Sequence, residues 1–144
     1  MESLRRDSVI PILFPMEKWS MNVSNFREVN PILPVRDVQS SVAFYRDRLG
    51  FHVSFRDCTA PETYVGVRRG GVELHLQYQR DQDMPKPGTI VIRIVVDSPD
   101  AVFEEFRQRD VADDGTVLED KPWGTREFTI KDPNGHRLTF YRDL

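Results

Sequence analysis

The sequence predicts an α+β protein of two βαβββ modules, whose curved mixed sheets surround one cleft with the helices on the outer faces. Two stretches, residues 29–79 and 89–144, each have the pattern of a strand, a helix and three further strands. A polar stretch with two prolines separates them, as a linker would. Residues 71–76 and 135–140 also share the positions of a glycine and a leucine, which favours duplication of one module.

The chain has 144 residues and a net charge of −3, with lysine and arginine dispersed among acidic residues. This length fits one domain made of two half-domains, and the charge pattern favours no nucleic-acid partner. Cys58 is the only cysteine, so an intrachain disulfide is impossible. No apolar run approaches the ~20 residues that cross a bilayer. We therefore expect no membrane partner and a cytoplasmic location.

Residues 1–28 show no clean period of apolar side chains. We expect them to be an appendage, peripheral to a domain formed by residues 29–144. Met21, inside this appendage, could serve as a second start site for translation.

The first module begins with an apolar strand at residues 29–35. Asp37 suits the N-cap of the helix that follows, because its carboxylate can accept hydrogen bonds from free N–H groups of the first turn. Apolar residues recur at helical spacing as far as Leu49, and Gly50 can adopt the left-handed conformation that ends a helix. Three strands follow, at residues 51–56, 64–68 and 72–78, with a glycine-rich hairpin turn between the last two.

The second module repeats this order. An apolar strand at residues 90–96 precedes Ser98, an N-cap residue, and Pro99, whose missing N–H costs nothing at the first helical position. Three strands are expected at residues 116–118, 126–130 and 137–142. The Asp-Pro-Asn-Gly sequence at residues 132–135 predicts a turn before the last strand. His52 and His136 lie beside turns, and we expect both to face solvent.

Three stretches carry a resemblance to a known family, at residues 33–51, 69–76 and 122–140. The first has a Phe-Tyr pair followed by Leu-Gly-Phe, and the third joins Pro-Trp-Gly-x-Arg to Asp-Pro-Asn-Gly. Together they resemble the vicinal oxygen chelate superfamily of glyoxalases, bleomycin resistance proteins and extradiol dioxygenases, over residues 29–144. The third stretch is most similar to bleomycin-resistance-type proteins. This resemblance implies a homodimer that binds a drug without altering it, in aromatic-lined crevices at the subunit interface.

Strand alternation separates the side chains that pack on a helix from those that face the cleft. In the fourth strand, Leu74 and Leu76 should pack on the helix. The cleft-facing side chains are then Glu73, His75 and Gln77 in the fourth strand, Val91, Arg93 and Val95 in the fifth, and Arg137, Thr139 and Tyr141 in the last. Charges of both signs, with Glu127 among them, face the cleft, so the sign of the ligand's charge stays open.

In the metal enzymes of this superfamily, four strand positions supply the metal ligands. The resemblance places Asn30, His75, Val91 and Thr139 at those positions. A catalytic transition metal needs about three imidazole, thiolate or carboxylate ligands. Valine cannot bind a metal, and asparagine and threonine are weak neutral donors. We therefore expect no metal and no cofactor, unless Glu73 or Glu127 joined His75 through a different register.

Eight residues are candidates for contact with a small-molecule ligand: Asn30, Phe55, Glu73, His75, Arg93, Trp123, Arg126 and Thr139. Trp123, between Pro122 and Gly124, either stacks on a planar ligand or only covers the edge of the core. His75 is an ordinary hydrogen-bonded polar residue, a ligand contact or a catalytic base. Arg126 either clamps an anionic group or forms a structural ion pair, which we favour. We assign no catalytic residue.

We therefore expect a small-molecule-binding protein of bleomycin-resistance type, which sequesters an antibiotic or a similar aromatic or cationic compound without metal. The alternative is a metal-dependent glyoxalase-like lyase or isomerase, or a dioxygenase. A third class is a structural or regulatory domain with a vestigial cleft. Metal content separates the first two classes, and a ligand-dependent change in tryptophan fluorescence separates a binding protein from the third.

Overall fold

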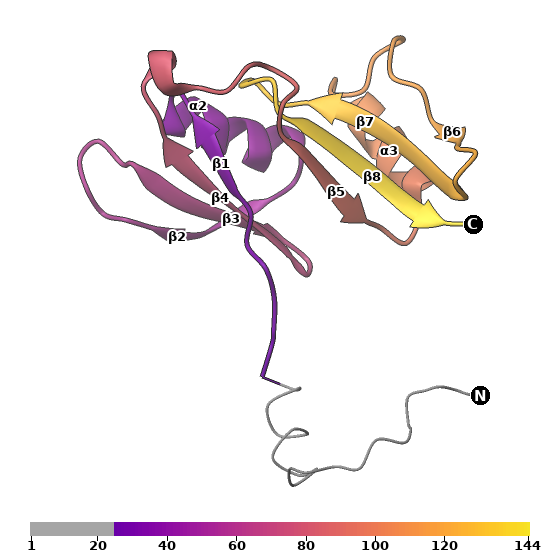
Figure 1. Ribbon diagram of the computed structural model, residues 1–144, viewed down its shortest axis with the longest axis horizontal. Coiled ribbons are helices and arrows are strands. Elements are labelled where there is room, and N and C mark those ends of the chain that lie inside the picture. Colours follow the sequence, from indigo (N-terminus) through magenta and orange to yellow (C-terminus); the bar gives the residue numbers. More distant parts are fainter. Residues whose placement is uncertain (1–24) are drawn as a thin grey trace, which may run out of the picture.

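The computed structural model describes residues 25–144, and Figure 1 shows two sheets with helices packed on them. Each sheet has four strands, and the predicted α+β class with two similar modules is confirmed. The expected appendage, residues 1–28, lies mostly outside the described residues, so it stays a prediction. No helix within residues 25–144 is long and apolar enough to span a bilayer.

The elements of the first module are β1 (Ile32–Val35), α2 (Val38–Ala43) with a π-helical continuation (Phe44–Arg48), β2 (His52–Arg56), β3 (Tyr64–Arg69) and β4 (Val72–Tyr78). A 3₁₀ turn (Asp81–Asp83) lies in the linker. The elements of the second module are β5 (Val91–Val95), α3 (Pro99–Gln108), β6 (Glu119–Asp120), β7 (Thr125–Lys131) and β8 (Arg137–Asp143).

The two sheets have the same topology. Their strand orders are β1-β4-β3-β2 and β5-β8-β7-β6. In each sheet the first strand of the module pairs in parallel with the last, and the other neighbours are antiparallel. The two halves of the chain are therefore the same supersecondary unit, as the shared glycine and leucine positions predicted.

The helix ends follow the predicted chemistry. The Asp37 side chain accepts from the N–H of Gln39 at 3.1 Å, and the Ser98 hydroxyl accepts from the N–H of Ala101 at 3.1 Å. Gly50 has a φ of 76°, in the left-handed region that a side chain would disfavour. One difference is that the first helix widens into a π-helical turn over its last five residues.

The sixth strand lies later than predicted, at Glu119–Asp120 instead of residues 116–118. The reason is local hydrogen bonding. Thr116 closes a turn with Asp113, since its N–H donates to the Asp113 carbonyl at 3.0 Å and its hydroxyl accepts from the Asp113 N–H at 3.2 Å. A threonine engaged in this way is unavailable to a sheet ladder.

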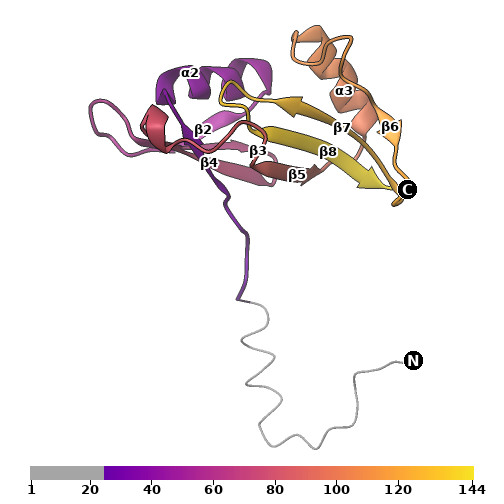
Figure 2. The same ribbon diagram turned by 45° about the horizontal axis from the view of Figure 1, so that its top comes forward.

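Both helices cover the same side of the sheets, as Figure 2 shows, and no helix within residues 25–144 covers the other side, which we call the open side. The alternation along the strands matches this arrangement. Leu74 and Leu76 are fully buried, whereas Val91 and Val95 on the opposite side of their sheet are exposed. The predicted division between helix-facing and open-facing side chains is therefore correct in β4 and β5.

A buried turn of the second module, residues 132–136, docks on the first module, and we call it the junction turn. The Asp132 Oδ1 atom accepts from the backbone N–H groups of Asn134 and His136, at 2.8 and 2.9 Å. Its Oδ2 atom accepts from the Tyr45 hydroxyl of the first module at 2.8 Å. Burial raises the pKa of Tyr45, so the hydroxyl keeps its proton and remains a donor.

Two more side chains of the junction turn bond to the first module. Asn134 donates to the Ser41 hydroxyl at 3.1 Å and accepts from the Arg36 N–H at 3.0 Å. The His136 Nε2 atom lies 2.6 Å from the Pro34 carbonyl oxygen, to which it must donate. His136 is only 2% exposed, so the expectation that it faces solvent was wrong. Packing between modules covers it, which the pattern within one module does not reveal.

We predict that Tyr45→Phe lowers the free energy of unfolding by roughly 1–3 kcal/mol, because it leaves a buried Asp132 oxygen without its donor. Urea denaturation would measure this loss. Tyr78→Phe is the matched control, because Tyr78 is exposed and its hydroxyl has no hydrogen-bond partner within residues 25–144. Equal midpoints for Tyr45→Phe and the wild type would show that the junction does not depend on this bond.

Candidate functional site

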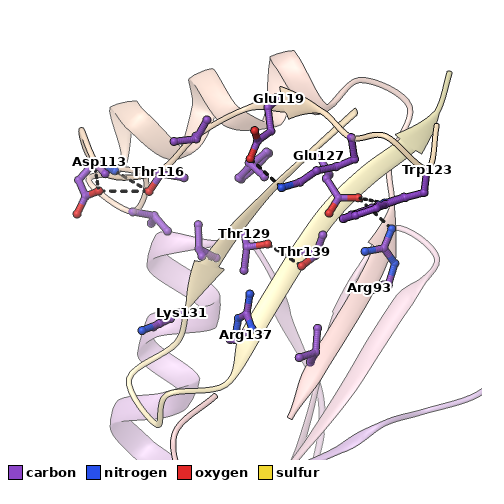
Figure 3. A pocket seen from close by; sticks show the side chains of 17 residues that line it. Arg93, Asp113, Thr116, Glu119, Trp123, Glu127, Thr129, Lys131, Arg137 and Thr139 are labelled. Carbon is purple, nitrogen blue, oxygen red and sulfur yellow. Dashed lines mark hydrogen bonds and ion pairs between the residues drawn. The ribbon is translucent and has the colours of Figure 1, made fainter. Parts of the chain in front are cut away.

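A hollow of about 730 Å³ lies on the open side of the second sheet. Its floor is formed by β5, β7 and β8, and its wall by the loop that follows α3, as Figure 3 shows. Three of the eight candidate residues line it, namely Arg93, Trp123 and Thr139. This volume lies within the usual range for small-molecule sites, so the hollow is the main candidate for the functional site.

One end of the hollow is built around the Glu127 carboxylate. Its Oε2 atom accepts from the Thr125 hydroxyl at 2.6 Å and from the Arg93 guanidinium at 3.1 Å, and the Trp123 indole N–H lies 3.5 Å away. Trp123 is 65% exposed, and Gly124 after it has a φ of 92°. The indole therefore stands at the rim with most of its surface free to meet a ligand.

Glu127 is ionised although its side chain is almost fully buried. Burial acts to raise the pKa of this carboxyl, but hydrogen bonds from Arg93, Thr125 and Trp123 outweigh it and bring the pKa below its usual value. The Arg93 guanidinium also lies over the Tyr141 ring, 4.2 Å from the centroid. The charges of Arg93 and Glu127 therefore largely cancel, and both side chains are held in place.

Thr139 lies in the floor of the hollow. It is 3% exposed, and its hydroxyl is 2.7 Å from the Thr129 hydroxyl on the neighbouring strand. This contact follows from the register, in which Thr129 is directly opposite Thr139. In this pair one hydroxyl donates to the other, so the second hydroxyl still has a hydrogen that it can donate to a ligand.

Three other candidates gather on the first sheet, together with Tyr64. The Tyr64 hydroxyl lies 2.8 Å from His75 Nδ1, and His75 Nε2 lies 2.9 Å from Glu73 Oε2. The Phe55 ring stands edge-on to the His75 ring, with centroids 5.0 Å apart. We call Phe55, Tyr64, Glu73 and His75 the first-sheet group, and none of its members lines the hollow.

Hydrogen bonding defines the polarity of the first-sheet group. The His75 hydrogen bond and the Arg68 ion pair, at 2.9 Å, lower the pKa of Glu73, so its carboxylate can only accept. His75 Nε2 must then carry a proton and donate to Glu73. In the neutral imidazole, Nδ1 accepts from the Tyr64 hydroxyl, which leaves the phenol oxygen free to accept from a ligand.

The remaining two candidates lie outside both groups. Arg126 points to the helix side of its sheet and pairs with Asp100 and Asp120, at 2.8 and 2.9 Å. Arg126 therefore forms structural ion pairs, which is the alternative that we favoured. Asn30 precedes β1, and its Nδ2 atom is buried without a hydrogen-bond partner within the described chain.

Sequence reasoning missed two members of these groups. Tyr64 was not among the eight candidates, but its hydroxyl is bonded to His75. Glu127 was expected on the cleft face, but only as a charge or a metal ligand. The signal for its position was alternation, because Phe128 and Ile130 are apolar and must face the helix.

The residues present do not fit a transition-metal centre. Within residues 25–144, no three His, Cys, Asp or Glu side chains are grouped so that they could hold a metal ion. Both ring nitrogens of His75 already have protein partners. Val91 has no donor atom, and the Thr139 hydroxyl is paired with Thr129. This donor set is too poor for Zn²⁺ or Fe²⁺.

Comparison with known proteins finds a matching family and similar proteins. The family model for the Glyoxalase/Bleomycin resistance protein/Dioxygenase superfamily matches residues 28–140. The bleomycin resistance protein of Geobacillus stearothermophilus is 26% identical over 129 residues, which cover 79% of this chain and 95% of that protein. The bleomycin resistance protein of Staphylococcus aureus matches equally well.

Solved structures agree with this placement. The bleomycin-binding protein from bleomycin-producing Streptomyces verticillus, complexed with copper(II)-bleomycin, is 32% identical, with a TM-score of 0.67 over 81% of this chain and 95% of that one. The bleomycin resistance determinant encoded on the transposon Tn5 shares the fold, with a TM-score of 0.70, 23% identity and coverage of 82% and 98%. From the family match and these relatives, the chain belongs to the glyoxalase/bleomycin resistance protein/dioxygenase superfamily.

Proposed function

We propose that this protein is a cytoplasmic binding protein that sequesters an antibiotic of the bleomycin type, or a similar compound, without metal and without chemical change. The observation that carries the proposal is the hollow, whose rim holds an exposed indole over a fixed Glu127–Arg93 pair. A large aromatic surface beside preorganised polar groups is the usual design of a small-molecule site. The bleomycin-binding protein of Streptomyces verticillus, 32% identical, supports the choice of ligand.

An enzymatic alternative has weaker support. Metal catalysis needs ligands that the four strand positions do not offer, since the other three positions besides His75 hold Asn30, Val91 and Thr139. His75 is bonded to Tyr64 and Glu73, so the simplest role for it is to orient the Tyr64 hydroxyl. Capture of a drug requires only affinity, with the protein in excess of the drug.

We further propose that the complete site forms between two copies of the chain. The hollow is lined by the second module alone, while the first-sheet group lies on the other sheet. Apolar side chains on the edge strands β1 and β5 are exposed, with Ile32 at 50%, Val91 at 46% and Val95 at 66%. Burying this surface in an isologous dimer would bring the first-sheet group of one chain over the hollow of another.

Drug binding should depend on the Trp123 indole. We predict that titration with metal-free bleomycin quenches Trp123 emission in a Trp19→Phe background, where Trp123 is the only tryptophan. Trp123→Ala, followed by calorimetry, should weaken binding by roughly 1–3 kcal/mol, the scale of an aromatic anchor. Tyr78→Ala, which removes an exposed aromatic ring outside the hollow, is the control and should bind normally. If Trp123→Ala binds as tightly as the control, the indole is not the ligand wall.

Binding should also be independent of a protein-bound metal. We predict that elemental analysis of the purified protein finds no stoichiometric Zn, Ni, Fe or Mn, because the donor set is too poor. About one metal per chain, lost on His75→Ala, would instead support the enzymatic alternative.

The protein should be a homodimer in solution. We predict a light-scattering mass of about twice the 16.8 kDa of one chain at micromolar concentration. Val95→Asp should shift the mass toward the monomer, because it places a charge on the exposed apolar edge of β5. Circular dichroism would verify that this variant is folded. A wild-type mass equal to one chain would contradict the dimer.

A further inference from the structure

Four cationic side chains line the hollow, and two of them are already paired. Arg93 bonds to Glu127 at 3.1 Å, and the Lys121 ammonium lies 2.8 Å from Glu119. The third carboxylate of the lining, Asp113, accepts from the backbone of its own loop at 2.8 Å. All three carboxylates of the hollow are therefore engaged.

The other two cations, Lys131 and Arg137, stand directly opposite each other on β7 and β8. Both line the hollow, and Figure 3 shows them at the same end of it. Neither forms an ion pair or a side-chain hydrogen bond with another residue in the described chain, in contrast to Arg93 and Lys121. Like charges directly opposite in a sheet are destabilising, so this pair costs stability when nothing neutralises it.

The first module has the same two positions with opposite charges. The shared glycine and leucine positions align Glu73 with Arg137, and the residue opposite Glu73 in the register is Arg68. There the Arg68 Nε atom donates to Glu73 at 2.9 Å. One cross-strand geometry therefore holds an ion pair in the first module and two unpaired cations in the second.

The surroundings of the two cations favour an anion. The Thr129 and Thr139 hydroxyls, two residues away on each strand, are hydrogen-bonded to each other. Since only one of them donates in that bond, the other has a hydrogen to offer. On the remaining side, Val91 lies next to Arg137 in the sheet and contributes only an apolar wall. An incoming oxyanion would thus meet two cations and a hydroxyl donor.

We propose that Lys131 and Arg137 form a subsite for an oxyanion, a carboxylate or phosphate group, at the end of the hollow remote from Trp123. Four residues of extended strand separate Lys131 from Glu127, the partner of the indole, a span of about 13 Å at ~3.3 Å per residue. The ligand would then carry a planar group and, at that separation, an anionic group. This ligand assignment rests on the proposed function, whereas the anion subsite can be tested on the protein alone.

The experiment is an NMR titration of the full chain with sodium phosphate and, separately, with sodium acetate, at constant ionic strength. We expect saturable amide shifts around residues 129–139, and the anion with the higher affinity identifies the preferred group. The double variant Lys131→Gln/Arg137→Gln should bind roughly tenfold more weakly or worse, because charge-assisted hydrogen bonds are lost.

Lys121→Gln is the matched control, because it removes a cation of the hollow that is already paired, and it should bind the anions as the wild type does. Arg137→Glu should abolish anion binding and raise the melting temperature, because it recreates the ion pair of the first module. Shifts that do not saturate, or saturable binding that the double variant retains or that Lys121→Gln loses equally, would overturn the subsite. Bleomycin binding through Trp123 is measured separately, so failure of one does not imply failure of the other.

Discussion

Docking of the junction turn on the first module is the constraint on which the rest of the structure depends. The Asp132 carboxyl accepts three hydrogen bonds, two within the turn and one from Tyr45, so it fixes the turn and its place at once. Every one of these groups is buried, and an unpaired buried polar group is costly. These bonds therefore hold the modules in the arrangement in which both open sheet faces point to the same side (Figure 2).

A second set of contacts reinforces this arrangement from the helix side. Arg69 of the β3–β4 hairpin donates to both carboxylate oxygens of Glu105 on α3, at 2.9 and 2.8 Å, and to the Leu49 carbonyl at 2.8 Å. These groups are partly exposed, so their contribution to stability is modest compared with that of the junction turn. Their geometry still opposes rotation of one module against the other.

Much of the fold could be predicted because it depends on local patterns. Alternation identified the buried face of β4, and the caps at Asp37 and Ser98 require only the chemistry of one side chain and the next turn. One error came from a contact between residues that are distant in the sequence, and the other came from a local turn. His136 was placed in solvent because its partner, Pro34, lies in the other module, and β6 was placed too early because Thr116 bonds to Asp113.

The candidate site was harder to predict than the fold because its contacts join residues that are distant in the sequence. Alternation correctly put Arg93, His75 and Thr139 on open faces. It does not show which of these side chains contact one another or are free to bind a ligand. Whether Arg93 is free depends on Glu127, which is 34 residues away in the sequence, and their 3.1 Å contact exists only in the folded chain. The sign of the hollow's charge, left open by the sequence, follows from which side chains are paired rather than from which are present.

Comparison of the two similar modules shows which positions build the fold and which build the site. Matching positions of the two modules retain the residues that build the fold, such as Leu74 and Leu138, which are both buried. The open-face positions have diverged, so that His75 corresponds to Thr139 and Glu73 to Arg137. Core positions are tightly constrained by packing within their own module, whereas open-face positions have fewer packed neighbours and so accept a wider range of side chains. Differences on the open faces are therefore the changes that two similar modules can accept at the lowest cost in packing.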